Sequence, residues 1–522
     1  MSSYYLGINR IAGLASGLDT KQMVEDLMRV ARAPLDRLLQ KKQILQWQQE
    51  DYRSINKKLM DFRTNYASPM RLQGTFLVKK ATSSDETAVT ATPGGSAVTG
   101  TYEITVTSLA KVGSLWSSES LYASYPDFDP DAEMSDTTKS FGLSAATSFD
   151  IITYKADGSV DATITINVNP DETLNQLLAK IGTQTSGRLT AFFEESTGKV
   201  VISTTKTGNY NENKFTLQDT NWFLLDYLKF SAYFSNPGDN TETFTGTDAE
   251  LTINGLTGIK QHENTFTLNN VTFTLKKTTA SPVLITVATD TDKIFDTVKS
   301  FVEQFNTLIG AINAELNEPR YADYQPLTDE QREQLSDWEI QQWEEKARSG
   351  LLRNDAILSD TVYRLRRALT TTVSGLTSSY DSIFDIGIST GQYWEGGKLY
   401  IDETKLREAI NEDPEGVMNL FTAGGTTYDE QGLGVRLYDE VNRAIDRITA
   451  QAGNPSSFSL YDNSYISRTI RELDERIAVT EERLQQLEDR YWRQFTAMEQ
   501  MIAQFNSQSM WLMQQAGMYG VQ

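Results

Sequence analysis

The C-terminal stretch of the chain, from about residue 464 to residue 515, carries apolar residues at alternating steps of four and three. A repeat of 3.5 residues keeps one stripe of an α-helix facing a partner helix and produces a left-handed coiled coil. No proline or glycine interrupts the stretch before Gly517, so it predicts one long helix that needs a second helix against its seam. The repeat positions are Ile466, Ile470, Leu473, Ile477, Leu484, Leu487, Tyr491, Met498, Met501, Phe505 and Leu512.

The partner of that helix is predicted at the other end of the chain. Asp19 or Thr20 is a suitable N-cap, and the segment that follows has apolar residues at heptad spacings. We expect one helix over about 20–32 and a second from Pro34 to about residue 66, because proline removes a backbone donor and crowds the preceding turn. The predicted coiled-coil seam consists of Val24, Met28, Leu35, Leu38 and Leu45 with Ile470, Leu473, Ile477, Leu484, Leu487 and Tyr491.

The middle of the chain has a different character. After Leu77, threonine, serine, glycine and asparagine are frequent, and alternating apolar and polar residues predict half-buried strands. These strands are expected at 102–107, 162–168, 199–203, 251–253, 265–268, 271–275 and 283–288. Helical spacing returns at about residue 292. The expected fold class is therefore multidomain α+β, with paired N- and C-terminal coiled-coil helices, a mainly helical leg, and two nested β-rich head domains inserted between them.

Four domains are expected from these changes in pattern. Residues 1–42 and 486–522 form a terminal coiled-coil foot, and residues 43–76 and 291–485 form the helical leg. An inner β-rich head domain comprises residues 77–110 and 245–290, and an outer β-rich head domain comprises residues 111–244.

Composition excludes several classes of function. The net charge of −22 argues against nucleic acid as a partner, because phosphate binding needs clustered lysine and arginine. The chain has no cysteine and one histidine, His262, which we interpret as an ordinary loop or strand residue. No zinc site, haem site or Ser–His nucleophile is suggested, so we expect no enzyme, metal or cofactor. No run of apolar residues is long enough to span a membrane, and the N-terminus lacks the pattern of a cleaved signal peptide.

Several segments resemble the bacterial flagellar filament cap protein family, also called flagellar hook-associated protein 2. They occur at both ends of the chain and through 251–421, in the order found in that family. The matching segments are GLASGLDTKQMVEDLM with APLDRL, LTINGLTGIKQHENTFTLNNVTFTLKK with SPVLITVATDTDKIFDTVKSFVEQFNTLI, PLTDEQREQLSDWEIQQWEEKARSGLLRND, GISTGQYWEGGKLYIDETKLREAINEDPEGVMNLF, and RYWRQFTAMEQMIAQFNSQSMWLMQQ.

The resemblance implies a structural assembly protein rather than an enzyme. Several copies would form a ring-shaped homo-oligomer at the distal tip of the extracellular filament, beneath which exported flagellin folds and inserts. The chain would be secreted by the flagellar type III export apparatus, and a cytoplasmic export chaperone would hold its C-terminal helix. Proteins of the hook–filament junction are further possible partners.

A foot that grips a growing filament and releases it needs adaptable contacts, and methionine packs adaptably. Residues beside the seam would form a second apolar face for such contacts. The residues expected to contact the filament or the chaperone are Phe495, Met498, Met501, Ile502, Phe505, Trp511 and Leu512.

Three matters stay open at the level of sequence. The outer head could attach to host or surface glycans, which makes a glycan-binding adhesin the alternative function. Any two acids could converge as a glycan-cleaving pair, although nothing marks one. Charged residues of the leg could either pair between subunits or form a solvated helical face; the candidates are Arg364, Arg366 and Arg367, facing Glu344, Glu345 or Glu408 of a neighbour.

Overall fold

The computed structural model describes residues 17, 19–234, 240–455 and 462–518. The chain divides into two compact units, one made of Met1–Phe76 with Thr291–Gln522 and the other of Leu77–Asp290. In the part of the chain that the structure describes, no helix is long and apolar enough to cross a membrane.

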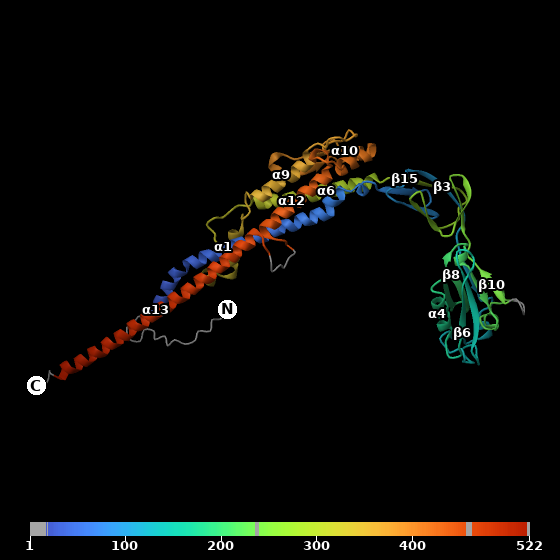
Figure 1. Cartoon of the computed structure of the whole chain (residues 1–522), viewed down its shortest axis with the longest axis horizontal. Helices are drawn as coiled ribbons and strands as arrows, with labels where there is room; N and C mark the ends of the chain where they lie inside the picture. Colours follow the sequence, from blue (N-terminus) through green and yellow to red (C-terminus); the bar gives the residue numbers. More distant parts are fainter. Residues whose placement is uncertain (1–16, 18, 235–239, 456–461, 519–522) are drawn as a thin grey trace. The chain divides into compact units, whose positions relative to one another are not determined.

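The first unit is built on two long helices from opposite ends of the chain, α1 (Thr20–Phe62) and α13 (Tyr465–Met518). They run side by side, and α13 continues beyond the N-terminal end of α1 (Figure 1). Asp19 caps α1, because its side chain accepts a hydrogen bond from the backbone N–H of Gln22 at 2.9 Å. The expected pairing of the two chain ends is therefore confirmed.

The expected break at Pro34 is wrong. Helix α1 continues through this residue without interruption. Pro34 is exposed, and so is Val30, the residue whose carbonyl oxygen loses its helical N–H partner. Water can hydrate that carbonyl. Met28, before the proline in sequence, is buried, and Leu35 and Leu38, after it, are half-buried, so packing supports the helix on both sides of the proline. The proline therefore removes one hydrogen bond on the solvent side without ending the helix.

The remaining helices of this unit pack around the C-terminal half of α1. Their aromatic core includes Phe62, whose ring centroid lies 6.0 Å from that of Phe301. The elements are the π-helical turn η1 (Arg63–Ala67), α2 (Ser68–Met70), α6 (Thr291–Asn317), α7 (Asp329–Glu333), α8 (Asp337–Arg348), α9 (Ala356–Thr370), α10 (Glu403–Glu412), α11 (Pro414–Thr422), α12 (Leu433–Ala452), and the small hairpin β16 (Ile388–Thr390) with β17 (Leu399–Ile401).

The second unit contains two separate hydrophobic cores. The first core lies between a five-stranded sheet of order β1-β15-β3-β11-β12 and a three-stranded sheet of order β13-β14-β2. Alternate residues of each strand point inward, as shown by Ile104, Phe273 and Ile285, which are fully buried. The strands are β1 (Lys79–Ser83), β2 (Val89–Pro93), β3 (Gly100–Ser108), β11 (Ala249–Ile253), β12 (Leu256–Gln261), β13 (Thr265–Leu268), β14 (Val271–Leu275) and β15 (Val283–Thr289).

The second core is formed by residues between Leu115 and Phe234. It lies among a four-stranded sheet of order β10-β9-β5-β6, a three-stranded sheet of order β4-β8-β7, and the short helices. The elements are β4 (Val112–Trp116), α3 (Leu121–Ser124), β5 (Thr147–Tyr154), β6 (Val160–Val168), α4 (Leu174–Gln184), β7 (Leu189–Glu194), β8 (Lys199–Thr207), β9 (Phe215–Gln218), α5 (Phe223–Asp226) and β10 (Thr241–Phe244).

The mixed fold class and every strand named from alternation are confirmed by these elements. The boundaries of the four expected domains stay a prediction. The two cores nevertheless draw on different parts of the chain, because the first takes residues 88–110 and 249–287 and the second takes residues 115–234.

One buried charge organises the end of the leg. Arg436 on α12 is completely buried, and its guanidinium donates to the carbonyl oxygens of Tyr428, Thr371, Thr372 and Asp429 at 2.6–3.0 Å. Two of these carbonyls follow the C-terminal end of α9, where unpaired helix carbonyls attract a cation. Arg436 therefore ties α9, the 428–429 turn and α12 together.

Replacing Arg436 by methionine should lower the free energy of unfolding by about 3 kcal/mol, because four carbonyl oxygens lose a buried charged donor. Urea unfolding of the whole chain would measure the change. Arg353 is exposed, so Arg353→Met should change stability by less than about 0.5 kcal/mol. Equal stabilities for the two variants would contradict the role assigned to Arg436.

Candidate functional site

The apolar residues of α13 pass through three environments along the helix. Ile466, Leu473 and Ile477, in its N-terminal part, are buried. Farther along, Leu484, Leu487 and Tyr491 are half-buried against α1. Toward the C-terminal end, Met501, Phe505 and Leu512 are exposed, although they continue the same heptad pattern. One sequence repeat therefore serves a closed contact at one end and an open surface at the other.

Near the N-terminal end of α1, helices α1 and α13 meet in a small cluster of aliphatic and aromatic side chains. Val24, Met28 and Trp492 are buried in it, and Leu484, Leu487, Tyr491 and Phe495 pack around them. Trp492 lies one position beyond the seam residue Tyr491, so the heptad pattern did not select it. Phe495 was expected on a free second face, but it is half-buried in this cluster.

The middle seam is looser. Leu35, Leu38 and Leu45 of α1 and Ile470 of α13 are half-buried rather than buried. Of the expected N-terminal seam residues, Val24 and Met28 are buried with Trp492 of α13, and the contacts of the others stay a prediction.

Polar pairs fix the register of the two helices closer to the leg. Lys42 Nζ lies 2.6 Å from Asp474 Oδ1, and Gln49 Nε2 donates to Ser467 Oγ at 2.6 Å. Arg53 Nη2 donates to Asp462 Oδ2 at 2.7 Å. Each pair joins residues more than 400 positions apart in sequence. A slip of α13 along α1 would break the pairs at Asp474 and Ser467, while Arg53 holds the segment just before α13.

Asp462 contributes to this register only when it is ionised. Burial raises the pKa of its carboxyl group, but hydrogen bonds from Ser467 and Ser464 and the charge of Arg53 outweigh burial and hold the pKa below its usual value. The stabilisation is therefore present above the ordinary pKa and is lost as the pH falls through the lower folded-state value.

The C-terminal part of α13 is an apolar surface open to solvent. The exposed fractions of Met501, Phe505, Trp511 and Leu512 are 58%, 66%, 57% and 59%. Met498 and Ile502, which belong to the same expected contact set, are half-buried. Burying a side chain of this size contributes about 1.5–3 kcal/mol, so this surface offers a partner a large apolar contact. We call Met501, Phe505, Met510, Trp511, Leu512 and Met513 the exposed end of α13.

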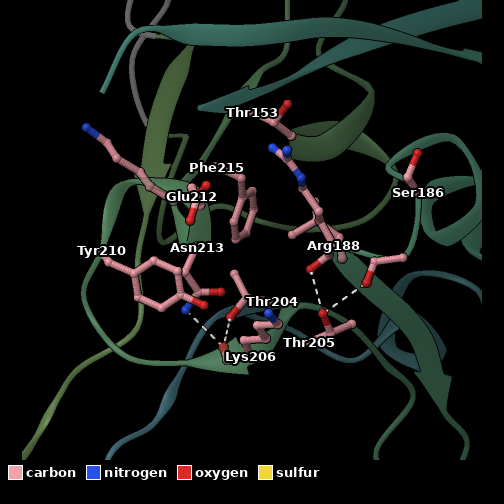
Figure 2. Close-up of a pocket in the computed structure, with 13 residues that line it drawn as sticks. Thr153, Ser186, Arg188, Thr204, Thr205, Lys206, Tyr210, Glu212, Asn213 and Phe215 are labelled. Carbon is pink, nitrogen blue, oxygen red and sulfur yellow. Dashed lines mark hydrogen bonds between the residues drawn. The ribbon is translucent and has the colours of Figure 1, made fainter. Parts of the chain in front are cut away.

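A polar cavity of about 320 Å³ lies in the part of the chain that forms the second β-rich core, and residues between Thr153 and Phe215 line it (Figure 2). Its side chains chiefly hold neighbouring backbone. The Thr205 hydroxyl donates to the carbonyl oxygens of Gly187 and Arg188, and Asn213 Nδ2 donates to that of Lys206. The guanidinium of Arg188 pairs with Asp161 at 2.8 Å. Nothing in this geometry favours a glycan ligand.

Among the described residues, no group of three or more histidine, aspartate or glutamate side chains could hold a metal ion. His262 is exposed, and its Nδ1 lies 2.8 Å from Asp248 Oδ1. The arrangement that remains is a pair of helices with one open apolar end, which is suited to binding another protein.

Replacing Trp492 by alanine should open the N-terminal end of α1. Loss of a large core side chain costs about 3–5 kcal/mol, and each 1.4 kcal/mol changes an equilibrium tenfold. Trypsin cleavage after Lys21, Arg29 and Arg32 should therefore be about a hundredfold faster, because cleavage requires local opening.

Trp511→Ala is the matched control, since Trp511 is on the same helix and exposed. It should leave the cleavage rate at these sites unchanged. An unchanged rate in Trp492→Ala would show that the cluster does not hold the two helices together.

Comparisons with known proteins agree with this architecture. Residues 246–507 match the model described as "Flagellar hook-associated protein 2 C-terminus", and residues 16–112 match "Flagellar hook-associated protein 2 N-terminus". Flagellar hook-associated protein 2 of Halalkalibacterium halodurans is 32% identical, with 96% of this chain and 98% of that protein covered. The Thermotoga maritima protein of the same name is 26% identical, with 98% and 96% covered.

A solved structure supports the fold. The crystal structure of the flagellar cap protein FliD D1-D2-D3 domains from Escherichia coli is similar with a TM-score of 0.53 at 23% identity. It covers 81% of this chain and 99% of that chain. Because two family models and a full-length relative match, the chain belongs to the flagellar hook-associated protein 2 family.

Proposed function

We propose that the chain forms an oligomeric cap at the distal tip of the flagellar filament and promotes the folding and insertion of exported flagellin there. Family membership supports association with the filament and oligomerisation. The observation that carries the proposal is the exposed end of α13, an apolar surface attached to a helix whose other end is held by the leg.

The division along α13 matches what a moving cap requires. The contacts of Ile466, Leu473 and Ile477 are internal and permanent, so this half of the helix transmits force to the leg. The exposed end of α13 would bind the terminal helices of filament subunits by apolar contact and shape. Three of its six side chains are methionine, whose unbranched, flexible side chain adapts to changing neighbours.

The seam assignments belong to the same proposal. Val24, Met28, Leu35, Leu38 and Leu45 would face Ile470, Leu473, Ile477, Leu484, Leu487 and Tyr491 in a coiled coil between foot and leg. Gln494 and Gln508 would weaken further association toward the tip, because polar residues in a seam lower its stability. Both ends of α13 would then have distinct partners.

Before assembly, the exposed end of α13 would need protection. We propose that a cytoplasmic chaperone holds it by laying this amphipathic helix in an apolar groove until the type III apparatus exports the chain. Proteins of the hook–filament junction are further candidate partners at the start of filament growth. The proposal includes no catalytic role, no cofactor and no nucleic acid.

The exposed end is tested by the variant Met501→Ser/Phe505→Ser/Trp511→Ser/Leu512→Ser, expressed in cells that lack the native gene. The variant should fold as the native chain does, because these side chains are exposed. Each lost apolar contact weakens binding about tenfold or more. Filaments should therefore be short or absent, while unpolymerised flagellin accumulates in the medium.

The matched control is Val479→Ser, an exposed apolar residue on the same helix outside this end. It should support filaments of normal length. The amount of each capping variant in the medium separates a failure of export from a failure of capping. Normal filaments built by the fourfold variant, at normal export, would refute the proposal.

A further inference from the structure

The leg carries a basic face on helices α9 and α12. Residues three or four positions apart share one side of a helix, which places Arg364 and Arg367 together on α9 and Arg443 and Arg447 together on α12. The two helices pack against each other. Tyr363, which is 63% exposed, lies next to this group. We call these four arginines the arginine face.

Carboxylates within the chain neutralise only part of this face. Arg364 and Arg447 both pair with Asp360, and Arg443 pairs with Glu440 at 2.8 Å. Arg367 is exposed and lies over the ring of Tyr428 at 5.5 Å, and no described carboxylate forms an ion pair with it. The acids on these two helices, Asp360, Asp439, Glu440 and Asp446, equal these four arginines in number, but none of them forms an ion pair with Arg367 in the part of the chain that the structure describes.

Glu440 shows that the network of this face is incomplete in the single chain. The residue is only 4% exposed, and its Oε2 accepts no hydrogen bond from any described residue. Arg364 Nη1 lies 3.9 Å from this oxygen, too far for a hydrogen bond. A buried carboxylate oxygen without a donor is unfavourable, so a small shift of Arg364 toward it on binding would be favoured.

An acidic face lies elsewhere on the leg, on α10 and α11, where α10 packs on α6 rather than on α9. Glu408, Glu412 and Glu415 are exposed, with the exposed Lys405 one turn before Glu408, and no described lysine or arginine forms an ion pair with these three glutamates. Glu412 accepts only a long hydrogen bond of 3.3 Å, from the Tyr380 hydroxyl. Glu408 and Glu412 are four residues apart, where like charges destabilise a helix.

We propose that the arginine face of one copy binds the acidic face of the next copy, so that the leg supplies a charged contact within the ring. The inference rests on the proposed function, which requires several copies of the chain. Because the two faces are different surfaces, the contact is heterologous, and heterologous contacts generate rings when the rotation between copies closes. Opposite charge on the two faces favours this pairing and disfavours contact between like faces.

The chemistry of the faces selects a second copy as the partner. A nucleic acid or another polyanion would be attracted by the arginine face but repelled by the net charge of −22 on the whole chain. A neighbouring copy instead presents the acidic face, whose carboxylates match the guanidinium groups in charge and in hydrogen bonding. Each copy carries both faces, so every arginine face in an assembly has an acidic face available to it.

Charge reversal tests the contact with the full chain. Arg367→Glu and Glu408→Arg should each weaken self-association about tenfold or more, measured by sedimentation of purified protein at low salt. An equimolar mixture of the two variants should assemble again, because the glutamate introduced into one variant meets the arginine introduced into the other. The chain carrying both substitutions should assemble as well. Arg353→Glu, outside both faces, should assemble as the native chain does.

The outcomes separate this contact from the proposed function. Native assembly by both single variants would overturn the contact while leaving the ring intact. Loss of assembly in both variants without recovery in the mixture would show that the faces do not meet each other. A native chain that stays monomeric at every concentration would contradict the proposed ring itself. Thermal unfolding of each variant, unchanged from the native chain, excludes a folding defect as the cause of lost assembly.

Discussion

The pairing of α1 with α13 is the interaction on which the rest of the first unit depends. It joins segments more than 400 residues apart through Val24, Met28 and Trp492 at one end and through Lys42, Gln49 and Arg53 nearer the leg. The apolar cluster supplies attraction, and the polar pairs select one register. Because the two ends of the chain belong to one unit, the β-rich segment Leu77–Asp290 is an insertion in the sequence of that unit.

The same pairing explains how one helix can have a permanent half and an open half. The apolar heptad residues of α13 are buried or half-buried as far as Met498, and from Met501 onward most of its apolar residues are exposed. Nothing in the heptad pattern changes at this point. The change comes from the partner, since α1 begins at Thr20 and the described chain offers no second helix against Phe505 or Leu512.

Periodicity predicted what depends on one element, and it failed where several elements meet. The N-cap at Asp19 and the alternating strands follow from local sequence. Trp492 was missed because a residue beside the seam becomes buried only when the crossing of two helices is known. Pro34 was misjudged because the sequence does not show that it lies on the exposed side of α1, where water can hydrate the carbonyl that loses its partner. Arg436 gave no local signal at all, since its four carbonyl acceptors lie on separate segments. The partners of β5, at Val160–Val168 and Phe215–Gln218, likewise required the fold.

Hydrogen–deuterium exchange along α13 in the purified full chain tests the central claim most directly, because amide exchange reports how firmly each helical turn is held. Slow exchange around Ile466–Ile477, intermediate exchange around Leu484–Trp492 and fast exchange from Met501 to Met513 are the expected result. Uniform slow exchange through Met513 would show that the exposed end is covered within the chain. Uniform fast exchange from Leu473 onward would show that α1 does not hold α13.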